Sequence, residues 1–445
     1  MGSMIKQMAR ALQALMINKA NEIGRSSGMI IRKRNFDGAA FFQMMIFSEL
    51  GQAWSSLAEL CQAAVQSGVQ VSRQAVNKRF TPVAAKFMQM MVAETVQMII
   101  QTTPATREAL SACSQVVLCD STTIDLPDEL AEEWVGCGGN EQDISAALKV
   151  NVQWDWQSGQ VMDVILQDGK AHDRSTVDQM QKPQAGALLI RDTGYFKIDE
   201  FASLLADDVS VLTRYKAGTV VMDTEGKRLD LTTWLPEQAL SVDQSIEIPV
   251  LVGAQAQLPM RLIVQRVPQA VVQQRQARLE EEARRRQEPI RQTSYALAEW
   301  TIVLTTAPAA LLTAWAALIF LHVRWQIELI FKLWKDQFKI DEWHTTNPWR
   351  ILCEVHARLI AALLSQWLMS VEQHSNARYS TARAVQTIRK KAWHIGAVLT
   401  DWPALCSALT SLFHCLAHVP PMHRSRQKPR LFQLFEALKQ AGAFP

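Results

Sequence analysis

The spacing of apolar and polar residues along the chain predicts two helical regions on either side of a region of strands. Residues 1–105 are rich in Ala, Gln, Met and Leu at helical spacing and contain no convincing strand pattern. From about residue 106, short apolar runs of strand length alternate with turn residues. After Lys339 the helical pattern returns. This order predicts a mixed α/β fold with helical regions at both ends.

Short apolar runs predict the strands of the central region. They cover residues 115–120, 146–156, 160–166, 186–192, 209–215, 248–253, 260–267 and 300–306. Two of these runs end in a carboxylate, at Asp120 and at Asp192. Because strand ends of one sheet meet at a common edge, we expect the two carboxylates to lie close together. Each Asp taken alone is better interpreted as a turn former or helix cap, and it is the pairing of the two that favours a site.

The segment 324–335 predicts an amphipathic helix with a buried and a charged face. The buried stripe consists of Ile327, Phe331, Trp334 and Phe338. The charged face has one acid, Glu328, among the cations Arg324, Lys332, Lys335 and Lys339. An acid among cations suits a divalent metal beside a polyanion, since the acid binds the metal and the cations bind phosphates. A solvated helix face is the simpler interpretation of this stretch on its own.

Residues 56–79 have the pattern of a helix-turn-helix. A helix over Ser56–Gln66 is followed by a turn at Gly68 and by a second helix that Ser72 caps. The second helix presents residue types that contact phosphates or base edges: Arg73, Gln74, Asn77, Lys78 and Arg79. Plain helical hairpins share this pattern, so DNA binding is one of two interpretations.

Charge is distributed unevenly, although the net charge is only +3. Residues 106–150 hold nine acids against two basic residues, and residues 376–445 hold ten Lys and Arg against two acids. The second segment ends in a basic tail after a Pro-Pro pair at 420–421, with Arg424, Arg426, Lys428 and Arg430. An acidic middle beside basic ends fits a metal-dependent site flanked by segments that bind nucleic acid.

Cysteines and apolar segments indicate the cellular compartment. The seven cysteines form no CxxC pair, which argues against a disulfide framework and a zinc module and favours a reducing cytoplasm. Residues 1–34 lack the uninterrupted apolar core of a signal peptide. Residues 301–323 are uncharged, but Pro308 divides them into a β-rich and an Ala/Leu-rich half. We therefore expect a buried strand and a buried helix there rather than a membrane span.

The spacing R-x3-E-x6-K of Arg324, Glu328 and Lys335 resembles the Tyr-Arg-Glu-Lys signature of bacterial insertion-sequence transposases of the IS-four family, relatives of the transposon-five enzyme. Asp120 followed by Ser and Thr, and an Asp-x-Gly-Tyr-Phe element at Asp192, also resemble that family. The resemblance covers roughly residues 50–370 and implies a ribonuclease-H-like core. The long interval before Glu328 leaves room for the β-rich insertion of the transposon-five type.

Site residues follow from the resemblance position by position. It implies that Asp120, Asp192 and Glu328 are the catalytic, metal-binding acids. It implies that Arg324 and Lys335 hold the DNA end, with Lys332 on the same face. Trp300 resembles the tryptophan on which a flipped base stacks in the family, although core packing explains it equally well.

One position departs from the signature. Three residues before Arg324, where the family has tyrosine, the chain has Leu321. In the family that tyrosine contacts a phosphate near the transposon end. The departure puts end binding in doubt and marks a variant or a degraded copy.

Four regions are expected from these patterns and the resemblance together. They are a helical DNA-binding domain (1–105), a ribonuclease-H-like catalytic core (106–216 and 297–375), a β-rich insertion (217–296) and a basic helical domain (376–445). Within the insertion, the charged run Gln274–Arg286 is interpreted as a solvated helix face or a mobile arm.

The resemblance implies a cut-and-paste DNA transposase that nicks, forms a hairpin and transfers strands. Two divalent ions about 4 Å apart can stabilise the attacking and leaving oxygens, and carboxylates suit Mg²⁺, with Mn²⁺ as a substitute. The expected partners are terminal inverted repeats, target DNA and a second copy of the chain, in the cytoplasm at the nucleoid and without a membrane. Two alternatives stay open: a metal-dependent nuclease without strand transfer, and a transposase-derived regulator that only binds DNA.

Overall fold

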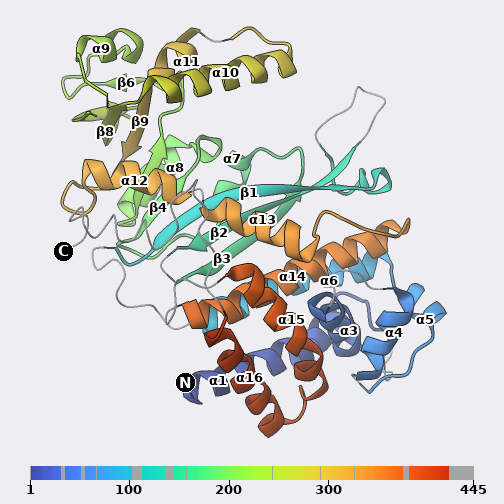
Figure 1. Ribbon diagram of the computed structural model, residues 1–445. Helices are drawn as coiled ribbons and strands as arrows, with labels where there is room; N and C mark the ends of the chain where they lie inside the picture. The colour runs from blue at the N-terminus through green and yellow to red at the C-terminus, as the bar shows by residue number, and fades with distance from the viewer. Residues whose placement is uncertain are drawn as a thin grey trace. The chain divides into compact units, whose positions relative to one another are not determined.

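The computed structural model describes residues 2–419 except 32–35, 52–55, 67, 103–112, 137–144, 157, 243, 291, 325 and 374–379 (Figure 1). The chain divides into two compact units. Of the described residues, unit 1 contains 2–102, 121–171 and 327–419, and unit 2 contains 113–120 and 172–326. The predicted basic tail and the Pro-Pro pair lie outside the described residues.

The N-terminal part of unit 1 consists of helices packed around α3 (Gly38–Gly51). Helix α3 is apolar on all sides and is buried from Gly38 to Leu50, as expected for the central helix of a bundle. The other helices are α1 (Gly2–Gln13), the π-helical turn η1 (Ala14–Lys19), α2 (Ala20–Ser26), α4 (Leu57–Gln66), α5 (Arg73–Asn77) and α6 (Pro82–Thr102). The described part of residues 1–105 is therefore helical, as its composition predicts.

The C-terminal part of unit 1 contains four further helices. They are α13 (Gln326–Phe338), α14 (Pro348–Gln373), α15 (Thr381–Ala397) and α16 (Trp402–Ala417). Helix α14 contains a segment, Pro348–Met369, that is long and apolar enough to cross a membrane, but its apolar stretch is buried inside the protein. Arg358 of α14 pairs with Glu49 of α3 at 3.0 Å, and both side chains are fully buried. Helix α14 thus connects the two parts of unit 1.

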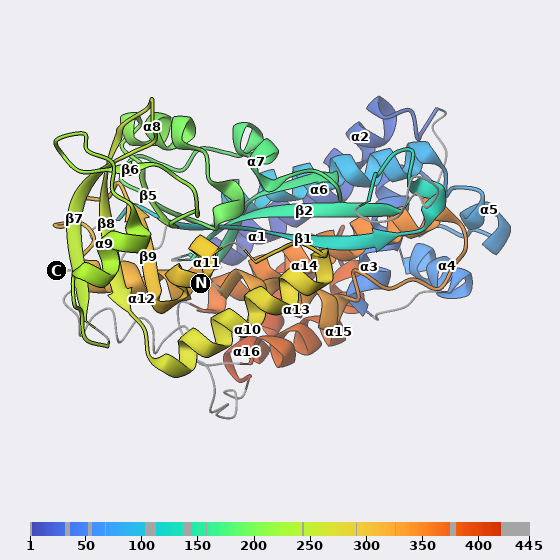
Figure 2. The ribbon, with the colours of Figure 1, turned by 90° about the horizontal axis from the view of Figure 1, so that it is seen from above.

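Strands β2 (Ala146–Asp155) and β3 (Gln160–Asp168) form the predicted antiparallel hairpin of unit 1. Its turn includes Gly159 at a φ of +72°, a conformation that favours glycine. Helices α6 and α14 pack on β3. In both ribbon views β2 runs beside β1 (Val116–Leu126) (Figures 1 and 2).

Strand β1 is longer than predicted. The apolar run ends at Asp120, but the strand continues to Leu126. Ile124 and Leu126 are buried while Thr123 and Asp125 are exposed, so the alternation of a half-buried strand continues past the carboxylate. Asp120 therefore lies within a strand rather than at its tip.

The strands of unit 2 continue the sheet from β1. They are β4 (Leu188–Arg191), β5 (Ser210–Arg214), β6 (Val221–Met222), β7 (Ser245–Val252), β8 (Leu258–Arg266) and β9 (Trp300–Thr305). β4 pairs parallel with both β1 and β5, and β9 pairs antiparallel with β5. β8, β7 and β6 follow in antiparallel order.

Strand order defines the fold class. The order is β3-β2-β1 in unit 1 and β1-β4-β5-β9-β8-β7-β6 in unit 2, with β1 passing from one unit to the other after Asp120. The order β3-β2-β1-β4-β5 is that of a ribonuclease-H-like core, and β6 to β8 come from residues 217–296. The predicted mixed α/β fold with a β-rich insertion is confirmed.

The remaining helices of unit 2 are short, except for α10 and α12. They are α7 (Asp173–Thr176), α8 (Ile198–Ala206), α9 (Leu231–Glu237), α10 (Gln269–Arg286), α11 (Gln292–Ala296) and α12 (Ala314–Arg324). The charged run lies in α10, which is solvated along most of its length. Arg275 anchors this helix, because it donates to the carbonyls of Ala298 and Trp300. The uncharged segment 301–323 forms β9 and α12, as predicted.

Candidate active site

The register of β1 and β4 places the two predicted aspartates side by side. The last paired residues of the two parallel strands are Cys119 and Arg191. Asp120 and Asp192 are the next residues on each strand. Their carboxylates therefore leave neighbouring strands at the same level of the sheet, on the side opposite to Cys119 and Arg191.

Arg324, the last residue of α12, lies between these two carboxylates. Its Nη1 is 2.9 Å from Oδ2 of Asp120, and its Nη2 is 3.8 Å from Oδ2 of Asp192. The side chains of Arg324, Asp120 and Asp192 are 14%, 19% and 40% exposed, respectively. The cluster is thus shielded from solvent on the β1 side and open on the Asp192 side.

Asp192 also acts as a helix cap, the alternative role considered for it from the sequence. Its carboxylate accepts the backbone N–H of Thr193 at 2.7 Å and caps the 3₁₀ turn Thr193–Tyr195. The next residue is Gly194, where a Cβ would lie 2.8 Å from Oδ2 of Asp173. A larger residue at this position would displace the Asp173 carboxylate. Tyr195 then packs in the core, so the whole Asp-x-Gly-Tyr element fixes the position of the Asp192 carboxylate.

A buried ion pair lies on the other side of the sheet from the aspartates. Arg191 is 2% exposed and contacts Glu200 of α8 at 2.6 Å. Burial lowers the pKa of Arg191, but Cys119 and Glu200 act more strongly together and raise it. Burial raises the pKa of Glu200 despite the charge of Arg191. Sequence reasoning missed this pair, although strand alternation already directs Arg191 away from Asp192.

All described residues of the predicted helix over 324–335 are helical. Arg324 ends α12, α13 begins at Gln326, and Trp325 lies outside the described residues. The predicted helix is therefore confirmed in its described part. The apolar stripe of α13 is confirmed, since Ile327, Phe331, Trp334 and Phe338 are all buried.

The charged residues of α13 belong to unit 1. Glu328 is half-buried and Lys332 is exposed. Lys335 donates to the carbonyl of Thr123 on β1 at 3.1 Å and lies 3.5 Å from Asp341. The backbone and carboxylate contacts hold the Lys335 ammonium group beside the second half of β1.

A divalent metal ion needs several donor atoms that converge on one point. No group of three or more His, Cys, Asp or Glu side chains among the described residues is arranged to hold a metal. Asp120 and Asp192 do converge on one cation, the Arg324 guanidinium, and they offer only oxygen donors. Hard ions such as Mg²⁺ prefer such donors and retain several waters. The two carboxylates therefore fit part of a magnesium site, to which a third ligand must be added.

Two other predicted positions lie in the core. Trp300, at the start of β9, is 7% exposed, and the Arg266 guanidinium lies 5.8 Å from its ring centroid. Leu321, the departure from the signature, is buried in α12. The side chains of Trp300 and Leu321 thus pack in the core.

The helix-turn-helix segment has its predicted local structure. Ser56 and Glu59 bond reciprocally at the start of α4, which is a capping box. Ser72 caps α5 by accepting the Ala75 N–H at 3.2 Å, and α5 packs on α4. The side chains of Arg73, Gln74, Asn77 and Lys78 are exposed. Arg79 instead lies over the Phe36 ring at 5.2 Å.

Comparison with known proteins identifies the family of this chain. The family described as "Transposase DDE domain" matches residues 111–364, more than half of the chain and a range that contains both aspartates, Arg324 and Glu328. The chain belongs to this family of DDE transposases.

Individual relatives are also transposases. The chain is 26% identical over 366 residues to the transposase of insertion sequence IS231C from Bacillus thuringiensis subsp. berliner, which covers 77% of this chain and 75% of the relative. It is 25% identical over 442 residues to the IS231F transposase of B. thuringiensis subsp. israelensis, with coverages of 93% and 91%. The IS421 transposase of Escherichia coli is 25% identical over 363 residues, with coverages of 78% and 90%.

Among solved structures, the chain resembles the piggyBac transposase in its synaptic complex with hairpin DNA. The TM-score is 0.48 at 9% identity, over 98% of this chain and 85% of that chain.

Proposed function

We propose that this DDE transposase moves an insertion sequence by cut and paste, cutting at the terminal inverted repeats and joining the freed ends to target DNA. The observation that carries the proposal is the β1–β4 register, which puts Asp120 and Asp192 side by side around one cation. Carboxylates that share a cation are what metal-dependent phosphodiester cleavage requires.

The proposed ligands of the metal ions are Asp120, Asp192 and Glu328. Bound Mg²⁺, or Mn²⁺ in its place, would activate the attacking oxygen and stabilise the leaving oxygen. Asp120 is held rigidly within β1, and Asp192 is held by its cap on the 3₁₀ turn. Glu328 is proposed as the third carboxylate, from α13.

The cations around these acids are proposed to hold DNA phosphates. Arg324 would leave the carboxylates when a metal ion neutralises them and would donate to a phosphate near the transposon end. Lys332 is exposed on α13, and Lys335 lies beside β1. Both would neutralise backbone charge on the same DNA end.

The order of steps is proposed as nicking, hairpin formation and strand transfer. A base flipped out of the hairpin would stack on Trp300, and such stacking is worth about 1–3 kcal/mol. Since the Arg266 guanidinium lies over this ring, Arg266 would have to move before a base could stack.

Recognition of the ends is proposed for α4 and α5. Arg73, Gln74, Asn77 and Lys78 form an exposed polar set on α5 and its end, suited to phosphates and base edges. We propose that a homodimer holds two ends at once, in the cytoplasm at the nucleoid. We also propose that the chain has four functional domains: 1–105, 106–216 with 297–375, 217–296 and 376–445.

The test uses DNA that carries the terminal repeats flanking the gene. Wild-type protein with Mg²⁺ should nick this DNA at the repeat end, and Glu328→Gln should bind it normally but fail to nick. A pre-cleaved end should be joined to a plasmid; nicking without joining would indicate a nuclease. Binding without nicking by the wild-type protein would indicate a regulator, the alternative that Leu321 supports.

A further inference from the structure

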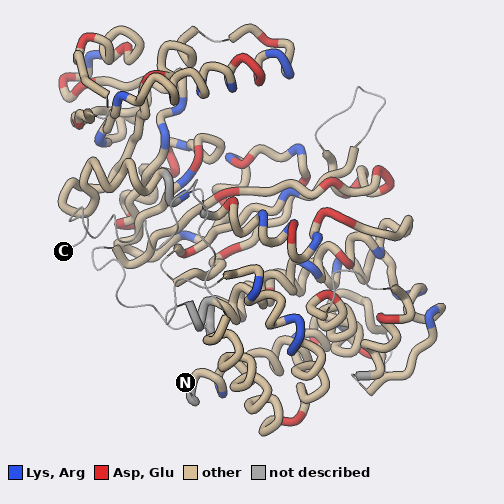
Figure 3. Tube along the Cα trace, in the orientation of Figure 1, with Lys and Arg blue, Asp and Glu red and all other residues tan. Residues whose placement is uncertain are grey.

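The exposed residues of the hairpin of helices α15 and α16 include cations but almost no acids. Between residues 381 and 419 the sequence has four Lys and Arg and a single acid, Asp401. The Asp401 carboxylate caps α16 by accepting the N–H of Ala404 at 3.1 Å. Figure 3 shows the basic positions along α15. Exposed residues that serve only solubility usually mix both signs, which these residues do not.

The cations of α15 lie along one side of the helix. Arg383, Lys390 and His394 are exposed and have the spacing i, i+7, i+11, which places them within about 40° of one another. The opposite side is buried and consists of Ala384, Val385, Ile388, Ala392 and Ile395. Arg389 differs, because it lies over the Phe338 ring at 5.3 Å and serves packing.

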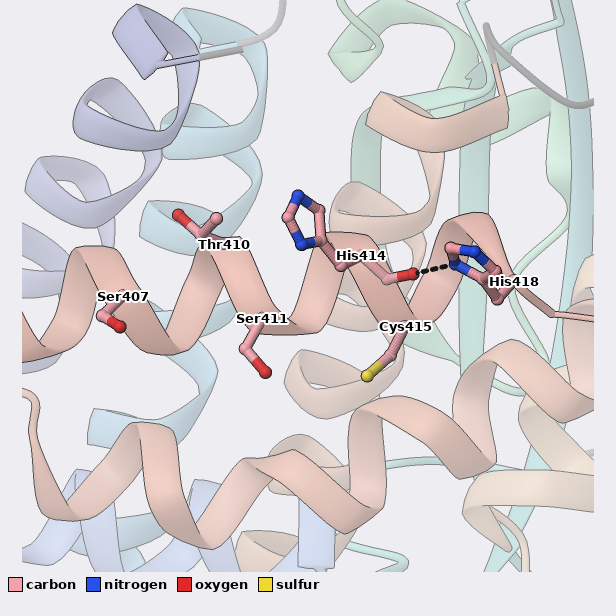
Figure 4. A pocket seen from close by; sticks show the side chains of 6 residues that line it. All are labelled: Ser407, Thr410, Ser411, His414, Cys415 and His418. Carbon is pink, nitrogen blue, oxygen red and sulfur yellow. Dashed lines mark hydrogen bonds between the residues drawn. The ribbon is translucent and has the colours of Figure 1, made fainter.

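Helix α16, which packs on α15, contributes a pocket. The pocket is lined by Ser407, Thr410, Ser411, His414, Cys415 and His418 (Figure 4). Ser407, Ser411 and Cys415 point to one side of the helix, and Thr410 and His414 to the other. Hydroxyl and imidazole groups can all donate hydrogen bonds to an anionic oxygen.

Lys391 connects the pocket to the cationic side of α15. Its Nζ donates to Oγ of Ser411 at 3.2 Å and is only partly buried. The hydroxyl of Ser411 can accept this bond and still donate its own proton to a third group. Lys391 and Ser411 thus provide a positive charge and a hydroxyl donor at one place.

We propose that the α15–α16 hairpin binds the phosphate backbone of duplex DNA. One phosphate would lie at Lys391 and the α16 pocket, and Arg383 and Lys390 would neutralise two more. Contacts to phosphates carry no sequence information, so binding through them would be independent of sequence. The inference rests on the proposed function and deepens it: the hairpin holds DNA outside the recognised repeat.

The experiment measures binding to a random duplex of about 30 base pairs as a function of salt concentration. The slope of log K against log salt is negative, and each lost phosphate contact makes it less steep by about 0.9. The double variant Arg383→Gln/Lys390→Gln should therefore reduce the steepness of this slope by about 2. It should also weaken binding at least tenfold at low salt. Ser411→Ala/His414→Gln, which leaves the surface charge on Lys391, should weaken binding about threefold.

The matched control is Lys227→Gln/Arg228→Gln, which removes the same charge from exposed positions in the β-rich insertion. It should leave the slope within about 0.5 of wild type. Equal slopes for Arg383→Gln/Lys390→Gln and the control would overturn the proposal. Wild-type affinity in both this variant and Ser411→Ala/His414→Gln would also overturn it. Failure of the proposed function would appear differently, as absence of nicking on the terminal repeats by the wild-type protein, whatever the slopes.

Discussion

The guanidinium of Arg324 lies 2.9 Å from the carboxylate of Asp120, with the carboxylate of Asp192 on its other side at 3.8 Å. Two carboxylates at the same level of neighbouring strands repel each other, and a cation between them relieves that repulsion. Arg324 provides this cation in the protein itself. A divalent ion must therefore compete with Arg324 for the same oxygens.

Arg324→Gln should bind Mn²⁺ more tightly than wild type, by roughly threefold, because a partly shielded competing cation is removed. The same variant should lose DNA nicking. Titration calorimetry without DNA measures the affinity, and Lys332→Gln, an exposed cation of α13, is the control. An Arg324→Gln protein that binds Mn²⁺ no better than the control would refute the competition.

The Arg191–Glu200 pair should be important for stability. Glu200→Leu leaves a guanidinium that is 2% exposed without its carboxylate, which should cost about 3 kcal/mol in the free energy of unfolding. Asp207→Ala removes the carboxylate of the Lys182–Asp207 pair, which is short but exposed, and should cost under about 1 kcal/mol. Urea unfolding of both variants measures the difference; equal costs would show that burial is not the cause.

His356 should make the stability depend on pH. Burial lowers its pKa from 6.5 to about 4, so the unfolded chain takes up a proton in this range that the folded chain does not. The stabilisation is complete above pH 6.5 and is lost as the pH falls toward 4. Between pH 7 and 5, wild type should lose about 2 kcal/mol more than His356→Leu in urea unfolding. Parallel losses in the two proteins would contradict the assignment.

Trp300 should affect both folding and hairpin formation. Trp300→Ala empties a buried position and should cost about 3 kcal/mol of stability. Trp300→Phe keeps most of the packing but offers a smaller ring, so it should slow hairpin formation while sparing nicking. Single-turnover assays that separate the two steps measure this. Equal slowing of nicking and hairpin formation in Trp300→Phe would assign Trp300 to the core alone.

Much of the fold was predictable because the strands are apolar runs separated by turns. The hairpin of β2 and β3, the short β4 and the β-rich insertion all follow from such runs. The second half of β1 was not predicted, since polar residues from Asp120 to Thr123 interrupt the run and only Ile124 and Leu126 maintain the alternation.

The candidate site was predictable only in part. Asp120 and Asp192 were expected to meet because each ends an apolar run, and the strand register brings them together. The position of Arg324 between the acids depends on tertiary packing, which helical periodicity does not encode. The buried partner of Arg191 lies on a separate helix, so no local pattern indicated it.

The most direct test of the account is iron-mediated cleavage of the polypeptide at the metal site. Fe²⁺ bound in place of Mg²⁺, with ascorbate and peroxide, cuts the backbone close to the ion. The account predicts cuts beside Asp120, Asp192 and Glu328 that excess Mg²⁺ suppresses. Cuts at Asp120 and Asp192 but not at Glu328 would remove Glu328 from the site, and cuts at none of the three would contradict the central claim.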